Sequence, residues 1–209
     1  MNLKRVLRVY RAEDLRLRKR RRRKQVSTAR VPRPISDAPN AQWALDFITD
    51  ALSSGRRFRV LSVVDEWTRE CLALRADVSL PSWKVVAALD EVALFRGVPR
   101  RLIVDHGPEF LAKALDAWAY AHGVELAFTR PAKPVDNCYV ESFHDKFRDE
   151  CRSTHWFLDL ADARRTVAAW REDYNTVRPH RGLGNRTPAA YAALMHANQE
   201  LESAHTTPA

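Results

Sequence analysis

The sequence predicts an α/β protein in which a mixed five-stranded sheet, an antiparallel meander followed by parallel strands, is flanked by helices. Three observations indicate this fold class. Strand-like runs separated by hairpin signals come first, strand-like and helix-like segments then alternate, and the excess of basic residues lies ahead of both. With 209 residues, 45% of them hydrophobic, the chain is long enough to bury a substantial core.

The excess positive charge is confined to an expected N-terminal arm and linker, residues 1–35. The first 34 residues contain 14 Lys and Arg against two acidic residues, which leaves 21 basic and 24 acidic residues in the rest of the chain. The run RLRKRRRRK, which includes Arg20, Arg21, Arg22 and Arg23, repels itself and has a polyphosphate as its natural counter-ion. It predicts salt-sensitive nucleic-acid binding without sequence preference. A solvated charge run or an import signal fits this run alone equally well.

The first three strands are expected to form an antiparallel meander after a Pro-rich linker that ends near Ala41. QWALDFITD and RRFRVLSVVDEWTR are strand-like and are separated by ALSSG, in which Gly55 marks a hairpin turn, and ECLALRADV supplies the third strand. Asp50 is expected to end the first strand, and Asp65 with Glu66 the second. These three acidic residues are therefore not expected to bind metal.

Helices and strands alternate in the next part of the chain. Apolar residues at helical spacing over residues 81–95, followed by Gly97, predict the first helix. Pro108 is expected at the first position of a second helix that ends at Gly123. Two further strands and two further helices are expected at residues 101–104, 124–129, 138–151 and 159–174. Right-handed crossovers would make the fourth and fifth strands parallel.

Three acidic residues stand out by their positions in these elements. Asp46 lies inside the first strand between apolar residues, Asp105 ends the fourth strand, and Glu141 lies in the helix after the fifth. If the first and fourth strands are neighbours, the two aspartates point at one spot, and Glu141 reaches it from above. Crowded carboxylates repel one another unless a cation lies between them. We therefore expect Asp46, Asp105 and Glu141 to bind metal.

Oxygen ligands of this kind select Mg²⁺ or Mn²⁺. Two such ions can activate a hydroxyl nucleophile and stabilise the leaving oxygen of a phosphodiester without a covalent enzyme intermediate. The carboxylates therefore predict phosphodiester chemistry with two bound ions, and no other cofactor is expected.

Five segments, in order along the chain, resemble the catalytic protein of IS3-family insertion-sequence transposases. They are QWALDF, RVLSVVDEWTREC, VDHGPEF, RPAKPVDNCYVESFHDKFRDEC and YNTVRPHRGLGNRTPAAY, with 35 residues between Asp105 and Glu141. The family's acidic triad falls on Asp46, Asp105 and Glu141. His106, where asparagine is common, and Val104, where a small residue is frequent, depart from the family pattern and are assigned no role.

This resemblance implies a ribonuclease-H-like fold shared with retroviral integrases, Mg²⁺ dependence, and DNA strand cleavage followed by strand transfer to target DNA. It also implies a homo-oligomer on the element's ends, in the bacterial cytoplasm at the nucleoid. A small helix-turn-helix partner protein, or its frameshift fusion, is implied as well, because the arm has no complete helix-turn-helix of its own.

Other basic residues are expected to contact DNA. Arg148 lies on the same helix face as Glu141, although an ion pair with Asp145 is the simpler alternative. In the tail, the segment YNTVRPHRGLG has a composition suited to gripping phosphates, but it also fits a structural turn after a helix. The full set of expected DNA contacts outside the arm is Arg130, Lys133, Lys146, Arg148, Arg178, His180 and Arg181.

Composition excludes some classes of protein and bounds the domains. No apolar run approaches membrane-spanning length, and three cysteines without a CxxC pair indicate reduced thiols inside a cell. The spacing of Cys138, His144, Cys151 and His155 is too long for one zinc ion. We expect an integrase-like catalytic core over residues 36–155, and helices and a tail over residues 156–209 that pack on it or extend it.

Two other functions remain open at this level. A ribonuclease of the same fold would need a fourth carboxylate from the first helix, for which Asp90 or Glu91 is available. A DNA-binding protein without activity would use the arm and an inactive core, although the presence of all three acidic residues argues against it.

Overall fold

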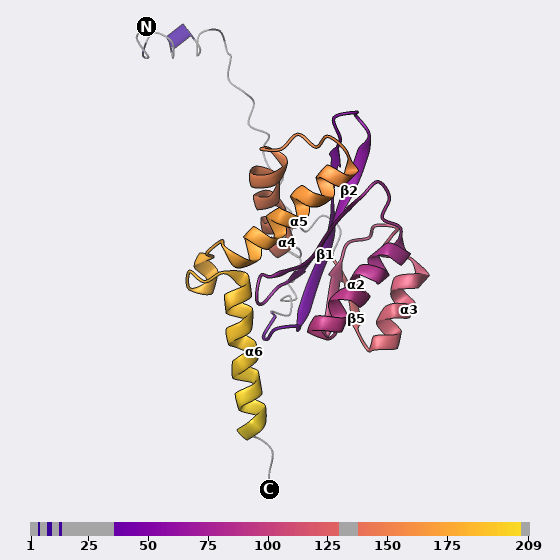
Figure 1. Ribbon diagram of the computed structural model, residues 1–209, viewed down its shortest axis with the longest axis vertical. Helices are drawn as coiled ribbons and strands as arrows, with labels where there is room; N and C mark the ends of the chain where they lie inside the picture. The colour runs from indigo at the N-terminus through magenta and orange to yellow at the C-terminus, as the bar shows by residue number, and fades with distance from the viewer. Residues whose placement is uncertain (1–3, 5–7, 10–12, 14–35, 130–137, 206–209) are drawn as a thin grey trace. The chain divides into compact units, whose positions relative to one another are not determined.

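The computed structural model describes residues 36–129 and 138–205, together with residues 4, 8–9 and 13 of the arm (Figure 1). The chain divides into two compact units, residues 1–33 and residues 34–209. Of the basic residues expected to contact DNA, those of the arm run and of the loop after the fifth strand lie outside the described residues, namely Arg20, Arg21, Arg22, Arg23, Arg130 and Lys133.

The predicted five-stranded mixed sheet is present, which confirms the fold class. Its strands are β1 (Gln42–Ala51), β2 (Arg57–Asp65), β3 (Cys71–Asp77), β4 (Arg101–Val104) and β5 (Glu125–Phe128). They lie in the order β3-β2-β1-β4-β5. The β1–β2 and β2–β3 pairs are antiparallel, whereas β1–β4 and β4–β5 are parallel.

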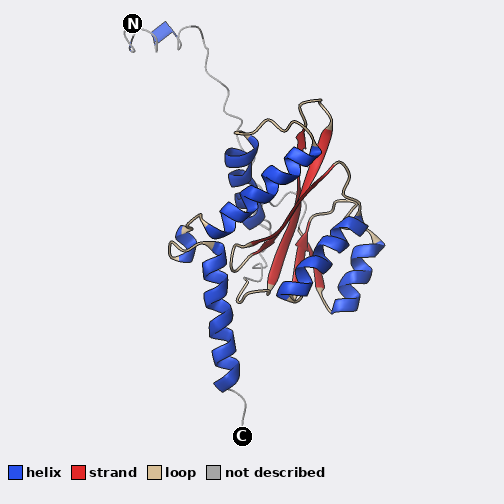
Figure 2. Cartoon of the chain, in the orientation of Figure 1, coloured by secondary structure: helices blue, strands red, loops and turns tan. Residues whose placement is uncertain are grey.

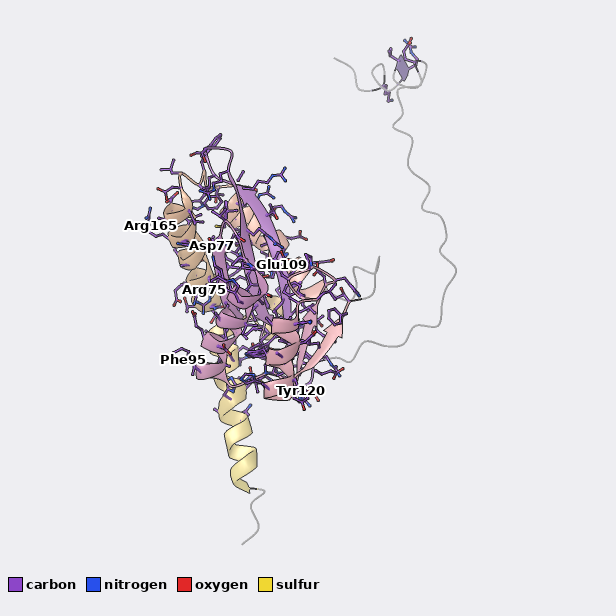
Figure 3. The ribbon with its side chains drawn as sticks, turned by 90° about the vertical axis from the view of Figure 1, so that its right-hand side faces the viewer. Arg75, Asp77, Phe95, Glu109, Tyr120 and Arg165 are labelled. Atoms are coloured by element: carbon purple, nitrogen blue, oxygen red, sulfur yellow. The ribbon has the colours of Figure 1, made fainter. Side chains whose placement is uncertain are left out.

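Helices cover both faces of this sheet (Figures 1 and 2). They are α2 (Ser82–Arg96), α3 (Lys113–His122), α4 (Cys138–Phe147), α5 (Leu160–Thr176) and α6 (Pro188–His205), with a π-helical segment η2 (Arg148–Arg152) after α4 and a 3₁₀ turn η3 (Arg181–Leu183) after α5. Helices α2 and α3 lie on one face, and α4 and α5 on the other. Phe95 and Tyr120 project from the outer surface of the α2–α3 layer (Figure 3).

Strand β1 divides its side chains between two buried cores. Trp43 and Leu45 are fully buried in the core beneath α2 and α3. Ala44 and Ile48 are buried in the core beneath α4 and α5. Because side chains alternate between the faces of a strand, Asp46 belongs to the α4–α5 face.

The second helix begins later than predicted. It was expected from Pro108, but α3 begins at Lys113, and the N–H groups of Phe110 and Leu111 instead donate to the carbonyl of Gly107 in a turn. Phe110 is fully buried and stacks on Phe47 at 4.9 Å between ring centroids. Burying this ring requires the chain to turn inward before the helix starts. The other end is as predicted, since Gly123 adopts a left-handed conformation and ends α3.

Helix α5 shares the core of the α4–α5 face. Its Ala163, Val167 and Tyr174 are buried there with residues of β1 and β2, as is Phe157, which precedes it. Asp159 caps the helix by accepting a hydrogen bond from the N–H of Asp162. The domain boundary expected between residues 155 and 156 stays a proposal. Within the described residues, no helix has the length and apolarity needed to cross a bilayer.

Candidate active site

Parallel pairing of β1 with β4 brings Asp46 and Asp105 to the same level of two neighbouring strands. The last paired residues of the two strands are Ala44 and Ile103. Asp46, still within β1, and Asp105, just after β4, each lie two positions beyond this pair and therefore at the same level of neighbouring strands. The prediction that the first and fourth strands are neighbours is confirmed.

The carboxylate of Asp46 is three-quarters buried, with 24% of its side chain exposed. Its Oδ1 accepts a hydrogen bond from the N–H of Phe47 at 2.7 Å. Burial, and then the negative charges of Asp105 and Glu141, raise its pKa from 3.8 to about 6, against the opposing effects of the Phe47 N–H and the Arg59 charge. All three predicted carboxylates are therefore close enough to interact electrostatically.

Asp105 and Glu141 occupy more open positions than Asp46. Asp105 is half-buried, and its Oδ1 accepts a hydrogen bond from the N–H of Gly107 at 2.8 Å. Glu141 is exposed on α4, which packs against β1. Among the residues that the structure describes, no three His, Cys, Asp or Glu side chains are placed to hold a metal ion. The carboxylates thus share one region without being drawn in to ligand distance.

A buried histidine holds Asp46 from the side of α4. His144 Nε2 lies 2.8 Å from Ser62 Oγ, and the Ser62 hydroxyl donates to the main-chain carbonyl of Asp46 at 3.1 Å. Because the hydroxyl proton of Ser62 is used in this way, His144 Nε2 must donate to Ser62 Oγ and carries the ring proton. The lone pair of His144 Nδ1 then faces Asp46 Oδ2, at 3.6 Å. Two facing acceptors favour a proton or a cation between them. The oxygen-rich donor set and this arrangement both fit a hard divalent cation beside Asp46.

Sequence reasoning missed the role of His144, which it considered only as a zinc ligand or a core residue. Its position three residues after Glu141 was the available signal, because that spacing places the two side chains on neighbouring parts of one helix. Burial, and then the charge of Arg148, lower its pKa to about 4, so the ring is neutral at physiological pH.

Gly107 is required by Asp105 itself. A Cβ at this position would stand 2.9 Å from Asp105 Oδ1, which is closer than real Cβ contacts come. The glycine therefore leaves room for the carboxylate that its own N–H binds. Beyond it, Glu109 pairs with Arg59, whose guanidinium lies 4.0 Å from the centre of the Phe47 ring.

The other acidic residues considered from the sequence are engaged elsewhere. Asp50 pairs with Arg152 at 2.9 Å, and Asp65 accepts hydrogen bonds from three main-chain N–H groups near the ends of β1 and β2, as expected for structural residues. Asp90 accepts from the indole N–H of Trp118 at 2.6 Å. Glu91 pairs with Arg75.

Asp90 and Glu91 also belong to α2, on the opposite face of the sheet from Asp46. Neither supplies the fourth carboxylate that the ribonuclease alternative needs.

The predicted DNA contacts that are described divide into paired and cavity-lining residues. Arg148 forms the exposed ion pair with Asp145, at 2.8 Å, that was the simpler alternative. Lys146, Arg178, His180 and Arg181 line one cavity between α4 and the segment after α5. Arg69 also lines this cavity and was missed by the sequence analysis.

Two family models, both described as an integrase core domain, match residues 36–134 and 122–188. A 31.7 kDa protein of insertion element IS407 from Burkholderia multivorans is 46% identical over 203 residues, which cover 97% of this chain and 73% of that protein. The chain belongs to the integrase core family of insertion-element transposases. This transposase is also 43% identical over 199 residues to a 39.2 kDa protein of insertion element IS476 from Xanthomonas euvesicatoria, covering 95% and 58% of the two chains. The predicted transposase function and enzyme class are thereby confirmed.

Solved structures confirm the fold of this transposase. The HTLV-2 integrase catalytic core domain in complex with magnesium superimposes with a TM-score of 0.57 at 14% identity, covering 74% of this chain and 97% of that one. A chain of the simian T-cell lymphotropic virus intasome, in complex with the PP2A regulatory subunit B56 gamma, gives a TM-score of 0.67 at 14% identity, with coverage of 80% and 59%. The ribonuclease-H-like fold of retroviral integrase cores is therefore the fold of this chain.

Proposed function

We propose that Asp46, Asp105 and Glu141 are the catalytic carboxylates with which this transposase cleaves DNA strands and transfers them to target DNA. The observation that carries the proposal is the parallel β1–β4 register. It sets two aspartates from distant parts of the sequence side by side, with α4 packed across β1 to bring Glu141 toward them.

The three carboxylates would hold Mg²⁺ or Mn²⁺, and we propose two ions. Such ions, when bound, supply activation of the attacking hydroxyl and stabilisation of the leaving oxygen. The chain's own residues orient the ligands: Ser62 and His144 fix Asp46, and the Gly107 N–H fixes Asp105. The HTLV-2 core domain named above was solved with magnesium, which supports this choice of cation.

The proposed binding partners are DNA, further copies of this chain and a small helix-turn-helix protein. The arm's positive charge supports binding to the element's ends and to target DNA, and the intasome likeness supports several copies of the chain on DNA. Grouping with the IS3 family, a small helix-turn-helix partner or frameshift fusion, and a place at the bacterial nucleoid are also proposed. So is the division into an arm (1–35), a catalytic core (36–155) and a C-terminal part (156–209).

Replacement of Glu141 by Gln tests the proposal. The full chain is incubated with Mg²⁺ or Mn²⁺ and duplex DNA carrying the element's ends, and strand cleavage and joining are measured. Glu141→Gln should abolish both reactions and leave DNA binding close to wild type. Glu91→Gln is the matched control, because it removes the same charge from the opposite face of the sheet.

The same assays separate the alternatives. A ribonuclease would cut RNA paired to DNA and would not join DNA ends. A protein that only binds DNA would show no metal-dependent cleavage in any variant. Cleavage that survives Glu141→Gln would remove Glu141 from the catalytic set.

A further inference from the structure

A half-open cavity of about 450 Å³ lies between α4, the β2–β3 connection and the segment after α5. The cationic side chains around it are those of Arg69, Lys146, Arg178 and Arg181, and no acidic residue lines it in the described part of the chain. Its other polar residues are Tyr139, Ser142 and His180. This concentration of positive charge stands out because the chain after the arm contains more acidic than basic residues.

Most of these cations have no carboxylate partner. Among the described residues, Arg178 pairs with Glu150, but Arg69, Lys146 and Arg181 form no ion pair. Arg69 instead lies over the Tyr139 ring, with its guanidinium carbon 3.4 Å from the centroid. Burial, and then the charges of Arg178 and Arg69, lower the pKa of Lys146. The cations therefore repel one another, which is unfavourable unless an anion is bound.

Two residues that line this cavity each have a buried nitrogen atom without a hydrogen-bond partner within the described residues. These atoms are Nη1 of Arg69 and Nε2 of His180. His180 is 8% exposed and packs edge-on against Tyr174, at 5.0 Å between ring centroids. Buried polar atoms are nearly always paired, and a guanidinium nitrogen can only donate, so Arg69 Nη1 lacks an acceptor.

The backbone of Arg69 adopts an uncommon conformation in the connection between β2 and β3. Its φ is 63°, a left-handed conformation that non-glycine residues rarely adopt. The hydroxyl of Tyr174 donates to the carbonyl of Arg69 at 3.2 Å and holds the turn in place. An arginine in this conformation costs about 1 kcal/mol or more, and strained residues of this kind concentrate at functional sites.

We propose that this cavity is a phosphate-binding pocket in which Arg69, Lys146 and His180 bind a phosphate group of a DNA strand. The proposal deepens the proposed function, since it takes DNA as the partner. It goes beyond a general attraction of DNA to the basic arm, because it assigns one phosphate of the DNA to a defined pocket on the catalytic core.

The pocket lies within reach of a strand bound at the carboxylates. Tyr139 and Lys146 occupy one face of α4, and Glu141 points from another. A helix with its side chains is about 10–12 Å across, and successive nucleotides of a strand advance by about 3.4 Å. A strand with one phosphate in the pocket can therefore present a bond roughly three or four nucleotides away to Asp46, Asp105 and Glu141.

DNA affinity measured at several salt concentrations in EDTA tests the proposal without catalysis. Loss of one phosphate contact lowers the magnitude of the slope of log affinity against log salt by about 0.9 for duplex and about 0.7 for single strands. We expect Lys146→Gln, and separately Arg69→Gln, to lower the slope by this amount and to weaken binding roughly tenfold at low salt.

Arg75→Gln is the matched control, because it removes one positive charge from an exposed site on β3 (Figure 3), where Arg75 pairs with Glu91 of α2 and does not line the pocket. It should leave the slope unchanged, and melting temperatures should show that all three variants are folded.

A second arm replaces chloride by inorganic phosphate at constant ionic strength. If the pocket takes phosphate, wild-type DNA affinity falls more in phosphate than in chloride, and Lys146→Gln removes the difference. The proposal is overturned if folded Lys146→Gln and Arg69→Gln keep the wild-type slope, or if Arg75→Gln changes it as much as they do. Glu141→Gln should keep the full slope, so failure of the pocket and failure of the catalytic carboxylates give different results.

Discussion

Replacement of Asp46 by Asn should stabilise the metal-free protein at neutral and alkaline pH. The carboxylate is held in a largely buried position beside two other negative charges, which is unfavourable for its ionised form. The amide is isosteric and uncharged. Its oxygen can still accept from the Phe47 N–H, and its NH₂ can donate to the free lone pair of His144 Nδ1.

The size of the effect follows from the pKa of Asp46. A rise from 3.8 to about 6 in the folded protein corresponds, at about 1.36 kcal/mol per pKa unit, to about 3 kcal/mol. Because the folded-state pKa is raised, the favourable contribution of the protonated group is complete below pH 3.8 and is lost as the pH rises through about 6. Asp46→Asn should therefore add roughly 2–3 kcal/mol at pH 8 and almost nothing at pH 4.

Urea denaturation of both proteins from pH 4 to pH 8, in EDTA, measures this difference. For a chain of this size the gain at pH 8 equals a rise of roughly 4–12 °C in melting temperature. Asp50→Asn is the control on the same strand. It removes an ion pair with Arg152 instead of an unfavourable charge, so no gain is expected.

Addition of Mg²⁺ gives a second comparison. The wild-type protein should be stabilised by the ion, and Asp46→Asn much less, because a ligand has been removed. The reasoning would be refuted if Asp46→Asn destabilised the protein at pH 8, or if its gain were the same at pH 4 as at pH 8.

Two substitutions and one labelling experiment test other parts of the structure. Gly107→Ala should lower DNA cleavage at least tenfold, because the new Cβ would displace the carboxylate of Asp105, and should change stability in urea little. Unchanged cleavage would show that the carboxylate tolerates the shift. Asp65→Ala should destabilise the protein by roughly 2–4 kcal/mol in urea denaturation, since three N–H groups lose their acceptor, and a smaller loss would mean that water replaces it. Cys71 and Cys151 should not react with a thiol reagent at pH 8 until the protein unfolds, because burial raises the pKa of their thiols to about 12 and about 11. Fast labelling of either thiol in the folded protein would contradict this.

The sheet could be predicted from the sequence because its signals are local. Alternating apolar residues, the glycine at the hairpin turn and the glycines after two helices each act within a few positions. The proximity of Asp46 and Asp105 could be predicted from the topology, since a meander followed by right-handed crossovers leaves few possible strand orders. The start of α3 was misplaced because the burial of Phe110 against Phe47 is a tertiary effect that overrides the local preference of proline for a first helical turn.

The side chains that surround the site could not be predicted in the same way. Ser62, His144 and Arg69 come from three elements, and each obtains its role from contacts across the α4–α5 face. Nothing local marks Arg69, whose left-handed backbone would normally suggest glycine or asparagine. The family resemblance predicted the three carboxylates, but it did not predict the residues that position them.

Charge on the two sides of α4 has opposite consequences for a DNA strand. The three carboxylates repel a phosphate backbone, and burial, followed by the charges of Asp105 and Glu141, raises the pKa of Asp46 and disfavours its ionised form. The pocket beyond α4 carries unpaired cations that repel one another unless an anion is bound. Divalent cations on one side and a phosphate on the other relieve both forms of repulsion. Binding of DNA and binding of metal should therefore favour each other, because each removes a repulsion that the other partner would meet in the empty protein.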